Sequence, residues 1–567
     1  MKKRGWPLFA LCSLLFSCQV MPSVSSSNSS DSSLSTISYE KDEGGFYILE
    51  NNYFASTEDP TDLGQRNKVF VAEDVQEEPH CPFLRLYVGA KQIPVFTVKT
   101  NFSHTWSPSA SNRMQNGVAT IGLEGKATLK LQLSFNSIKS ITIRPLAREV
   151  PFYYDESRRV LSFTLSQIGQ YTIELTNDRT LHLFVNPIAA FSNPFSTSEN
   201  PMVFGPGVHD ASNDSRISPY NEVVLSSNQK VYLAPNAFVH ARFASTSTSG
   251  VEIKGTGYVS GATFERDPDA GTATVPLDFQ FCQDVVLADF AVLDPAGWCF
   301  NLYFCLDVSI DNAKVISSRS NGDGISVQSC QNVEVTNCFV RSWDDSLVVK
   351  NYPKWSNRAV EGTTQGIHFS HCLIWTDLAQ SMEIGYETVG AVMDDITFTN
   401  ITVLHNFHKA VFSIHNGNNA NVTNVAFRNI TVEDASMGQG DGTNRLIDIQ
   451  NLYSDNWSSS HKVTSLGSID GVVLSNIKIV GGNETPEVLI QGCIDSREGF
   501  SKEPHYVNDV RIEDVSLYGN ALDENYASLC KTYATSIVFS MTGSPITGST
   551  LHEQDVSSYG NNIDLLN

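Results

Sequence analysis

The sequence predicts an all-β protein in which an N-terminal β-sandwich, residues 38–187, is followed by a parallel β-helix, residues 188–567. The first part contains short runs of alternating apolar and polar residues between turn signals, with no helical periodicity between them. The second part contains a degenerate repeat, which returns after 23 and then 25 residues from Val285 to Val308 to Val333. Only 17% of the residues are charged, as is typical of an extracellular all-β protein.

The first 37 residues are predicted to direct export and to tether the protein. Residues 1–17 have the pattern of a signal peptide, whose apolar segment is too short to span a membrane. Leu15-Phe16-Ser17-Cys18 resembles a bacterial lipobox, which predicts cleavage before Cys18 and lipid attachment to its sulfur. Because Phe16 is unusual there, ordinary signal-peptide cleavage is the alternative. Residues 18–37 form a Ser-rich linker, so we expect an extracellular or cell-surface lipoprotein attached to the membrane only by its lipid.

The sandwich is predicted from strand-like runs that follow one another at short intervals. No acid–base constellation occurs among them, so this domain either binds carbohydrate or has a packing or spacer role. The runs are FLRLYV at Phe83, IPVFTV at Ile93, TLKLQLSF at Thr128, ITIRPL at Ile141, VLSFTL at Val160, YTIEL at Tyr171 and LHLFVNP at Leu181.

The β-helix is predicted from repeat units in which a strand ends at Asn or Asp before a turn. Units of this length stack so that each coil pairs with the next and the β-branched side chains form a continuous core. The Asn and Asp residues are expected to form turns. The units are DVVLADF at Asp284, DVSIDNA at Asp307, NVEVTNC at Asn332, DITFTNI at Asp395, NVAFRNI at Asn424, GVVLSNI at Gly471 and DVRIEDV at Asp509.

Charge and cysteine usage exclude several classes of partner. The formal net charge of −23 argues against nucleic acid and, more weakly, against a polyanionic substrate. Nine cysteines follow Cys18, none in a C-x-x-C pair, so we expect no metal site and no cofactor. Their odd number and their strand-like surroundings favour buried thiols over a disulfide framework.

Three aspartates, Asp323, Asp344 and Asp345, form the strongest candidate site. Asp344 and Asp345 follow Asp323 by 21 and 22 residues, about one coil, so the three carboxylates are expected to face one groove. Asp-Gly and Asp-Asp pairs also occur in ordinary turns, but two of them one coil apart are less easily explained in that way. Crowded carboxylates acquire different pKa values, as acid and base work on one bond requires.

The run N-x-D-G, then D-D followed by an apolar stretch and Lys350, resembles the polygalacturonase-type glycoside hydrolases. The dextranase and isopullulanase family is similar and adds an N-terminal sandwich. The resemblance covers about residues 187–515 and implies a right-handed β-helix and an inverting mechanism. It implies that Asp344 is the general acid, that Asp323 and Asp345 hold the attacking water, and that Lys350 contacts substrate.

Two further motifs of that family are altered here. Aligning DLAQSMEIGYET places Gln380 where the family has His, and aligning AVFSIHNG places Ser413 and His415 where it has Arg and Lys. Ser has no charge and His is mostly neutral at neutral pH, so a uronate would lack its cationic partner unless an irregular coil supplies Lys409. The residues expected to bind substrate, besides Lys350, are Gln380, Glu383, Glu387, His415 and Trp298. Glu383 has the alternative of a solvated strand residue.

We therefore expect an exported, monomeric, inverting glycoside hydrolase that acts on an α-linked neutral polysaccharide or oligosaccharide. The alternatives are a polygalacturonase acting on pectin, a lyase, or a non-catalytic β-helix that binds glycan. A lyase of this fold needs calcium and a basic Arg, and a glycan binder has no need of the paired aspartate motifs.

Overall fold

The fold was analysed in a computed structural model of the chain. It describes residues 40–41, 47–49, 67–106, 113–135, 138–176, 178–266, 274–352, 362–453, 465–495, 497, 501–522, 528–545 and 552–553. The expected signal peptide, linker and Cys18 lie outside these residues. None of the helices in the described part of the chain has the length and apolar character that a membrane crossing requires.

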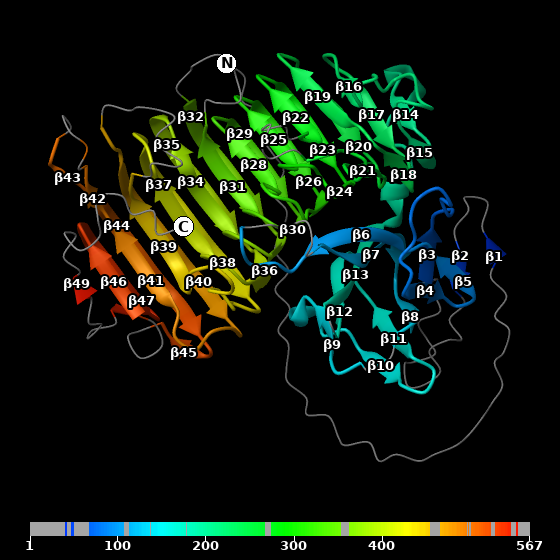
Figure 1. Cartoon of the computed structure of the whole chain (residues 1–567), viewed down its shortest axis with the longest axis horizontal. Helices are drawn as coiled ribbons and strands as arrows, with labels where there is room; N and C mark the ends of the chain where they lie inside the picture. Colours follow the sequence, from blue (N-terminus) through cyan, green and yellow to red (C-terminus); the bar gives the residue numbers. More distant parts are fainter. Residues whose placement is uncertain are drawn as a thin grey trace, which may run out of the picture. The chain divides into compact units, whose positions relative to one another are not determined.

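The N-terminal region is a sandwich of two mainly antiparallel sheets, drawn in blue and cyan in Figure 1. Their facing side chains, such as Leu86, Ile121, Leu131 and Leu183, form one apolar core. One sheet has the order β10 (Phe152–Asp155), β11 (Val160–Leu165), β8 (Ala127–Leu133), β4 (Leu84–Val88) and β5 (Lys91–Ile93). The other has the order β1 (Glu40–Lys41), β2 (Tyr47–Leu49), β3 (Asn67–Val71), β7 (Arg113–Glu124), β13 (Arg179–Pro187), β12 (Gly169–Leu175) and β9 (Ile141–Arg144), with β6 (Phe96–Asn101) also on β7.

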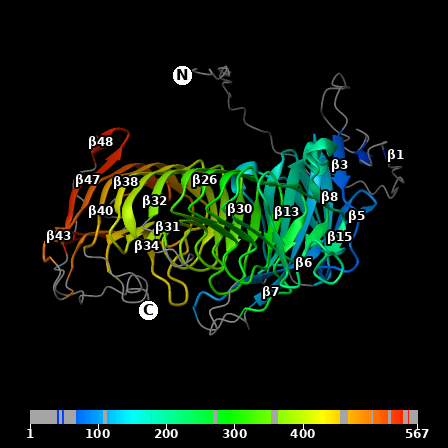
Figure 2. The same ribbon diagram turned by 90° about the horizontal axis from the view of Figure 1, so that it is seen from above.

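From β14 onward the chain forms a right-handed parallel β-helix, so the predicted all-β fold class is confirmed. Short 3₁₀ turns at Ile188–Phe191 and Thr197–Glu199 lie between β13 and β14, and a third, Leu146–Arg148, lies in the sandwich. Figure 2 shows successive coils stacked in sequence order from β26 through β32 and β38 to β47.

One strand of each coil joins a 12-stranded parallel sheet, called sheet 1 below. Its alternate side chains point inward, among them Met382, Ile384, Phe412 and Ile414 of the core. Sheet 1 consists of β16 (Glu222–Val224), β19 (Arg242–Thr246), β22 (Leu277–Gln280), β25 (Phe300–Tyr303), β28 (Ile325–Gln328), β31 (Leu347–Asn351), β34 (Met382–Thr388), β37 (Phe412–Asn416), β39 (Arg445–Asn451), β41 (Glu487–Gln491), β46 (Ser528–Thr532) and β49 (His552–Glu553).

The remaining strands of the coils form a 22-stranded sheet, called sheet 2 below. Its first strand in each coil is β14 (Met202–Phe204), β17 (Lys230–Leu233), β20 (Glu252–Lys254), β23 (Gln283–Ala288), β26 (Leu306–Asp311), β29 (Gln331–Thr336), β32 (Gly362–Ser370), β35 (Gly390–Thr399), β38 (Asn421–Val432), β40 (Ser468–Ile479), β44 (Val507–Leu517) and β47 (Ala534–Met541). Its second is β15 (Gly207–His209), β18 (Ala237–Val239), β21 (Tyr258–Ser260), β24 (Ala291–Leu293), β27 (Lys314–Ile316), β30 (Phe339–Ser342), β33 (Leu373–Thr376) and β36 (Thr402–Asn406), with β45 (Asn520–Ala521) and β48 (Ser544–Pro545) added later. A separate hairpin joins β42 (Cys493–Ile494) to β43 (Pro504–His505).

The repeated Asn and Asp residues form the corners of the coils. Asp307, the second residue of β26, and Asn312, which directly follows that strand, have φ values of 56° and 54°. Asn and Asp tolerate this left-handed conformation better than other residues with a side chain, which explains why the repeat keeps them at both ends. At later corners they also bond from coil to coil, as where Asn476 Nδ2 donates to Asn429 Oδ1 (2.8 Å). Asn312 therefore turns the chain after its strand as expected, whereas Asp307 bends the chain within the strand.

The sandwich packs against the short strands of sheet 2. Phe96 and Phe184 from the sandwich share an apolar cluster with Phe238, Tyr258 and Phe339 from β18, β21 and β30. The two parts belong to one compact unit, Tyr39–Asn567. This shared core favours the packing role considered for the sandwich.

The nine cysteines that follow Cys18 are buried thiols outside any disulfide framework, as predicted from their number and surroundings. Several stack from coil to coil: the Cys305 backbone N–H donates to Cys330 Sγ (3.2 Å), and Cys305 Sγ donates to the Phe279 carbonyl oxygen (3.4 Å). Burial raises the pKa of Cys299 well above its usual value, and Asp323 raises it further, so this thiol is protonated.

Candidate active site

The three aspartates lie in stacked turns that lead into neighbouring strands of sheet 1. Asp323 precedes β28, and Asp344 and Asp345 precede β31 one coil later. The Gly324 backbone N–H donates to the Asp345 carbonyl oxygen (2.8 Å), which fixes one turn upon the other. A Cβ atom at Gly324 would lie 2.3 Å from the Ser346 carbonyl oxygen, so this stacking accounts for the glycine of the N-x-D-G motif.

Buried hydroxyl groups hold the Asp-Asp turn. Ser342 Oγ donates to the Asp344 carbonyl oxygen (2.6 Å) and also lies 2.6 Å from Ser346 Oγ. The Asp345 backbone N–H donates to Asp344 Oδ1 (3.0 Å), and the Gln380 backbone N–H donates to Asp345 Oδ1 (3.1 Å). The expected Gln380 therefore contacts the site through its backbone, and both carboxyl groups are oriented before any ligand binds.

The Lys350 ammonium joins the carboxylates of the two turns. Its Nζ lies 3.6 Å from Asp323 Oδ2, 3.9 Å from Asp345 Oδ2 and 3.5 Å from Glu387 Oε2. The same atom lies 4.8 Å from the centroid of the Trp298 ring. Four side chains that the sequence predicts at the site thus surround one buried ammonium, namely Asp323, Asp345, Glu387 and Trp298. The ammonium is already paired with protein carboxylates.

The environment separates the pKa values of the three aspartates. Burial raises the pKa of Asp323, Lys350 opposes the rise, and the result is about 6. For Asp345 the same opposing effects, with Asp323 and Glu383 adding to the rise, give a pKa of about 8. Burial and the charges of Asp323 and Asp345 raise the pKa of Asp344 well above its usual value. Asp344 therefore holds its proton at neutral pH, and Asp323 is the first of the three to ionise.

A second row of charged side chains extends along the outer face of the later coils. His415 Nδ1 lies 2.8 Å from Glu383 Oε1 and Nε2 lies 3.3 Å from Asp448 Oδ2, while Arg445 Nη1 donates to Asp448 Oδ2 (3.0 Å). Ser413 Oγ donates to the other oxygen of Glu383. Burial opposes a charge on His415, but the two carboxylates outweigh it and raise its pKa to about 10.

This row corrects two sequence-based interpretations. Glu383 is fully buried, so its reading as a solvated strand residue is wrong. His415 is an imidazolium with both ring nitrogens beside carboxylates, so its reading as a mostly neutral side chain is wrong as well.

Sequence reasoning missed Asp448, Arg445, Arg266 and Trp106, and named Lys409 only as an alternative. Arg266, from an earlier coil, donates to the Asn321 side chain of the N-x-D-G motif, and Asp344 and Asp323 raise its pKa against a larger lowering by burial. Asp448 lies in the alternating run LIDIQ of β39. Because side chains alternate along a strand, a polar residue between two inward isoleucines is expected to point to the outer face of the β-helix. The irregular coil lengths hid its alignment with Glu383.

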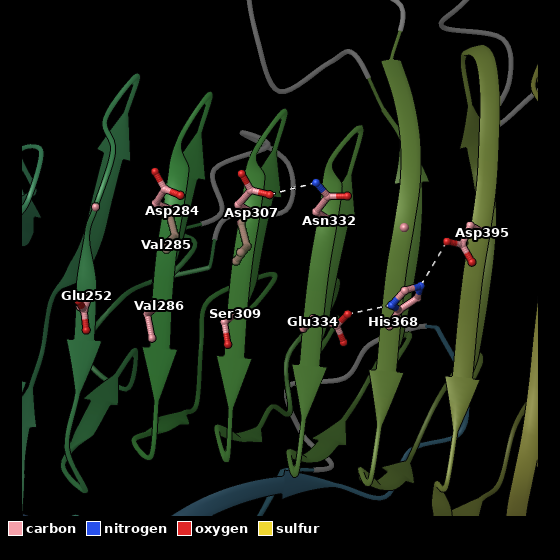
Figure 3. Close-up of a pocket in the computed structure, with 13 residues that line it drawn as sticks. Glu252, Asp284, Val285, Val286, Asp307, Ser309, Asn332, Glu334, His368 and Asp395 are labelled. Carbon is pink, nitrogen blue, oxygen red and sulfur yellow. Dashed lines mark hydrogen bonds and ion pairs between the residues drawn. The ribbon is translucent and has the colours of Figure 1, made fainter. Parts of the chain in front are cut away.

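A separate open hollow of about 710 Å³ lies on sheet 2, away from the aspartates (Figure 3). Outward side chains of β20, β23, β26, β29, β32 and β35 line it, including Glu252, Asp284 and Asp307. Figure 3 shows His368 between Glu334 and Asp395, with ring-to-carboxylate distances of 2.8 and 3.5 Å. The acidic side chains of the hollow are exposed or half-buried, unlike the buried aspartates, so the candidate site remains the aspartate cluster. Among the residues that the structure describes, no group of three or more His, Cys, Asp and Glu is arranged to hold a metal ion.

The sequence that carries this cluster matches a family model. Residues 221–519, which include every coil of the aspartate site, match glycosyl hydrolases family 28. The chain belongs to this family. The family establishes a glycoside hydrolase that acts on a polysaccharide, and no curated protein matches the chain in sequence.

Several solved structures are similar to this chain at low sequence identity. Dex49A from Penicillium minioluteum is 14% identical, with 80% of this chain and 93% of that chain covered and a TM-score of 0.47. The family 28 exopolygalacturonase of Yersinia enterocolitica is 12% identical, with coverage of 86% and 95% and a TM-score of 0.37. An exopolygalacturonase from Thermotoga maritima is 16% identical, with coverage of 61% and 84% and a TM-score of 0.36.

Proposed function

We propose that this family 28 hydrolase cleaves an α-linked neutral glycan with inversion at the anomeric carbon. The observation that carries the proposal is the convergence of three aspartates with unequal proton affinities around Lys350. An inverting glycosidase needs one carboxylic acid and one carboxylate on opposite sides of the scissile bond. Asp344, which keeps its proton, suits the first role, and Asp323, which ionises first, suits the second.

In the proposed reaction Asp344 protonates the glycosidic oxygen as its bond to the anomeric carbon breaks. A water molecule held by Asp323 and Asp345 adds its oxygen to that carbon from the opposite face and gives a proton to Asp323. The proton on Asp323 then returns through solvent to Asp344. One water is consumed, and each product carries a new hydroxyl group.

Lys350 and Glu387 act in this scheme as positioning residues. The ammonium lowers the pKa of Asp323 and Asp345, whereas Glu387 raises that of Asp323. Burial, the largest effect, raises the pKa of the proposed base, and with these two opposed charges the result is about 6, which leaves the base ionised at neutral pH.

The balance of charges supports a neutral substrate. Lys350 is matched by Asp323, Asp345 and Glu387, and His415 is matched by Glu383 and Asp448. A uronate carboxylate buried on this face would meet carboxylates whose cationic partners are already engaged. Sugar hydroxyls suit the face better, because they bring no further negative charge to it.

We also propose that the protein is exported and anchored through lipid on Cys18, on the basis of the signal-peptide pattern and the lipobox resemblance of its first residues. Such an address suits an enzyme whose substrate is a polymer too large to enter a cell.

The test of activity is product analysis with dextran, pullulan, galactan and polygalacturonic acid. The purified protein is expected to release reducing ends from a neutral polymer, and proton NMR recorded during the first turnovers is expected to show the β-anomer first. An ultraviolet-absorbing unsaturated product would instead establish a lyase, and the absence of any product from all four polymers would contradict the proposal.

A further inference from the structure

A loop of the sandwich domain reaches the coils that carry the aspartates. It follows β6 and comprises Asn101–Trp106. The Asn101 side-chain amide donates to the Ser318 carbonyl oxygen (3.1 Å), and its Oδ1 accepts from the Ser103 backbone N–H (2.9 Å). Trp343, which directly precedes Asp344, donates from Nε1 to the Ser103 carbonyl oxygen (2.9 Å). The loop is therefore bonded to the residue beside the proposed acid.

Two further coils hold the end of the same loop. His104 Nδ1 lies 2.7 Å from the Asp377 carbonyl oxygen, and the His104 carbonyl oxygen accepts from the Asp441 backbone N–H (3.1 Å). The Trp106 backbone N–H donates to Asp441 Oδ2 (3.3 Å). Bonds to four coils, those of β28, β31, β34 and β39, leave the loop little freedom, so the backbone of Trp106 is held in place before substrate binds.

The half-buried Trp106 ring lies among groups of the site. Its centroid is 6.2 Å from that of Trp343, with the rings at 73°, and 6.1 Å from that of His408, with the rings at 78°. Both neighbours therefore meet Trp106 edge to face. The Lys409 ammonium lies 5.1 Å from the Trp106 ring centroid. Trp106 is the contribution of the sandwich to the surroundings of the aspartates.

Lys409 has a buried stem and an unengaged head group. The residue is only 4% exposed, yet its ammonium has no ion-pair or hydrogen-bond partner among the residues described, and it lies over the face of the Trp106 ring. Burial lowers the pKa of Lys409, while Asp345 and Asp344 oppose that effect, so the ammonium lies within the field of the catalytic carboxylates. A nearly buried donor without a partner is costly unless a ligand or water receives its hydrogen bonds.

We propose that Trp106 and Lys409 form a subsite for one neutral pyranose ring of the substrate, so that the sandwich domain supplies part of the binding site. The inference rests on the proposed function, because it takes the aspartates as the place of bond cleavage. The C–H groups of a pyranose pack on the Trp106 ring, and the Lys409 ammonium donates to the hydroxyls at the edge of the same sugar.

The electrostatics favour a hydroxyl over an anionic group at this subsite. Asp344 and most of Asp345 hold their protons at neutral pH, but Asp448, whose pKa is held low by Arg445 and His415 against burial, is ionised and also acts on the Lys409 ammonium. The charge of the ammonium is therefore balanced in part without a ligand, and an uncharged acceptor uses its free hydrogen-bonding directions without adding another negative group. The subsite thus selects a neutral sugar next to the cleaved bond.

The test compares kcat and KM of full-length variants on whichever of dextran, pullulan, galactan and polygalacturonic acid the wild type cleaves fastest. Trp106→Ala is expected to raise KM about 2- to 10-fold, the scale of one aromatic contact, with kcat within about twofold. Trp106→Phe is expected to retain most of the affinity, and Lys409→Gln is expected to raise KM in the same way as Trp106→Ala. Tyr153→Ala, an exposed aromatic (70%) elsewhere on the sandwich, is the matched control and is expected to leave both constants unchanged.

Each outcome decides between the subsite and the proposed function. An unchanged KM for both Trp106→Ala and Lys409→Gln, in enzyme that still cleaves a neutral polymer, overturns the subsite and leaves the proposed function intact. Circular dichroism checks the fold, and if Trp106→Ala unfolds, Trp106→Phe and Lys409→Gln decide. Cleavage of polygalacturonic acid alone overturns the neutral sugar class, and no cleavage of any polymer overturns the proposed function and the subsite together.

Discussion

The Lys350 ammonium lies 3.6 Å from the carboxylate of Asp323, and both side chains are almost completely buried. An opposite charge at this distance favours the ionised carboxylate, whereas burial and Glu387 favour the protonated one. Their balance gives Asp323 a pKa of about 6, well below that of Asp344. By lowering the pKa of Asp323, the lysine lowers the pH at which the proposed base becomes ionised and active.

Replacing Lys350 by Met is expected to move the acid limb of kcat/KM to higher pH. The sign follows from the charge: without the ammonium the pKa of Asp323 rises above about 6, so a smaller fraction is ionised at each pH. The measurement is the pH profile of kcat/KM between about pH 4 and 9 in wild type and variant.

Glu387→Gln is the matched control for that experiment. Glu387 raises the pKa of Asp323, so its neutralisation is expected to move the same limb to lower pH. Shifts of both variants in one direction would show that the limb reports a group other than Asp323.

Asp344→Asn is expected to reduce kcat by at least about 10²-fold, the usual scale for loss of a general acid. The loss should be smaller on aryl glycosides with good leaving groups, because these need little protonation. The measurement is kcat on the polymer and on a matched pair of aryl glycosides whose phenols differ in acidity. An equal loss on both members of the pair would remove Asp344 from the role of acid.

Asp323→Asn tests the opposite side of the bond. Because water must be activated whatever group departs, its loss of kcat is expected to be similar, at about 10²-fold or more, on good and poor leaving groups. Near wild-type turnover in both Asp323→Asn and Asp344→Asn would place the chemistry elsewhere on the molecule.

His415→Gln is expected to destabilise the fold most at mildly acidic pH. Removing one member of a buried ion pair costs about 3–5 kcal/mol. The folded pKa of about 10 exceeds the value of about 6.5 in an unfolded chain, so the stabilisation is complete below pH 6.5 and declines as pH rises toward 10. Thermal midpoints of wild type and variant should differ most near pH 6 and converge toward pH 10. A difference that stays constant across this range would mean that His415 is neutral.

The repeat made much of the fold predictable from sequence. Asp307 near the start of β26 and Asn312 just after its end both adopt positive φ, and this requirement is visible as a spacing in the chain. In the sandwich, the long central strand β7 escaped prediction because NGVATIGLE contains two glycines and lacks regular alternation. Its burial on both faces, between the second sandwich sheet and the β-helix, explains why few polar residues interrupt it.

The aspartates were predictable because one coil separates Asp323 from Asp344, whereas the other members of the site depend on long-range packing. Trp106 is 237 residues before Trp343 in the chain, and only the docking of the sandwich brings them together. The charge of His415 depends on Asp448, whose register across β37 and β39 is hidden by a long and irregular connection. A lone histidine in a sequence carries no sign of the two carboxylates that protonate it.

Cys18→Ala tests the proposed anchor. The variant is expected to lose incorporation of labelled fatty acid and to move from the membrane fraction to the soluble fraction, because a lipid chain attached to the sulfur is the only proposed contact with the membrane. Unchanged labelling and fractionation would favour plain secretion after ordinary signal-peptide cleavage.

The final prediction concerns the charge of the substrate, and it depends on how the cations of the site are engaged. Family resemblance aligns Ser413 and His415 with an Arg and a Lys that hold a uronate, but Ser413 and both nitrogens of His415 face protein carboxylates. Of the three cations Lys350, His415 and Lys409, only Lys409 has an ammonium or ring nitrogen without a carboxylate partner among the described residues. Asp345 and Asp344 nevertheless raise its pKa against the effect of burial. A uronate on this face would bring its charge close to ionised carboxylates without a dedicated partner, which is too costly for tight binding.

We therefore expect kcat/KM on dextran, pullulan or galactan to exceed that on polygalacturonic acid by at least about tenfold, the equivalent of about 1.4 kcal/mol. Lys409→Gln separates the two substrate classes further. On a neutral polymer the variant loses one hydrogen-bond donor and should bind modestly more weakly, whereas on a uronate it would lose an ammonium that no described carboxylate engages and fail almost completely. Faster cleavage of polygalacturonic acid than of each neutral polymer, abolished by Lys409→Gln, would show that the ammonium of Lys409 serves a carboxylate after all.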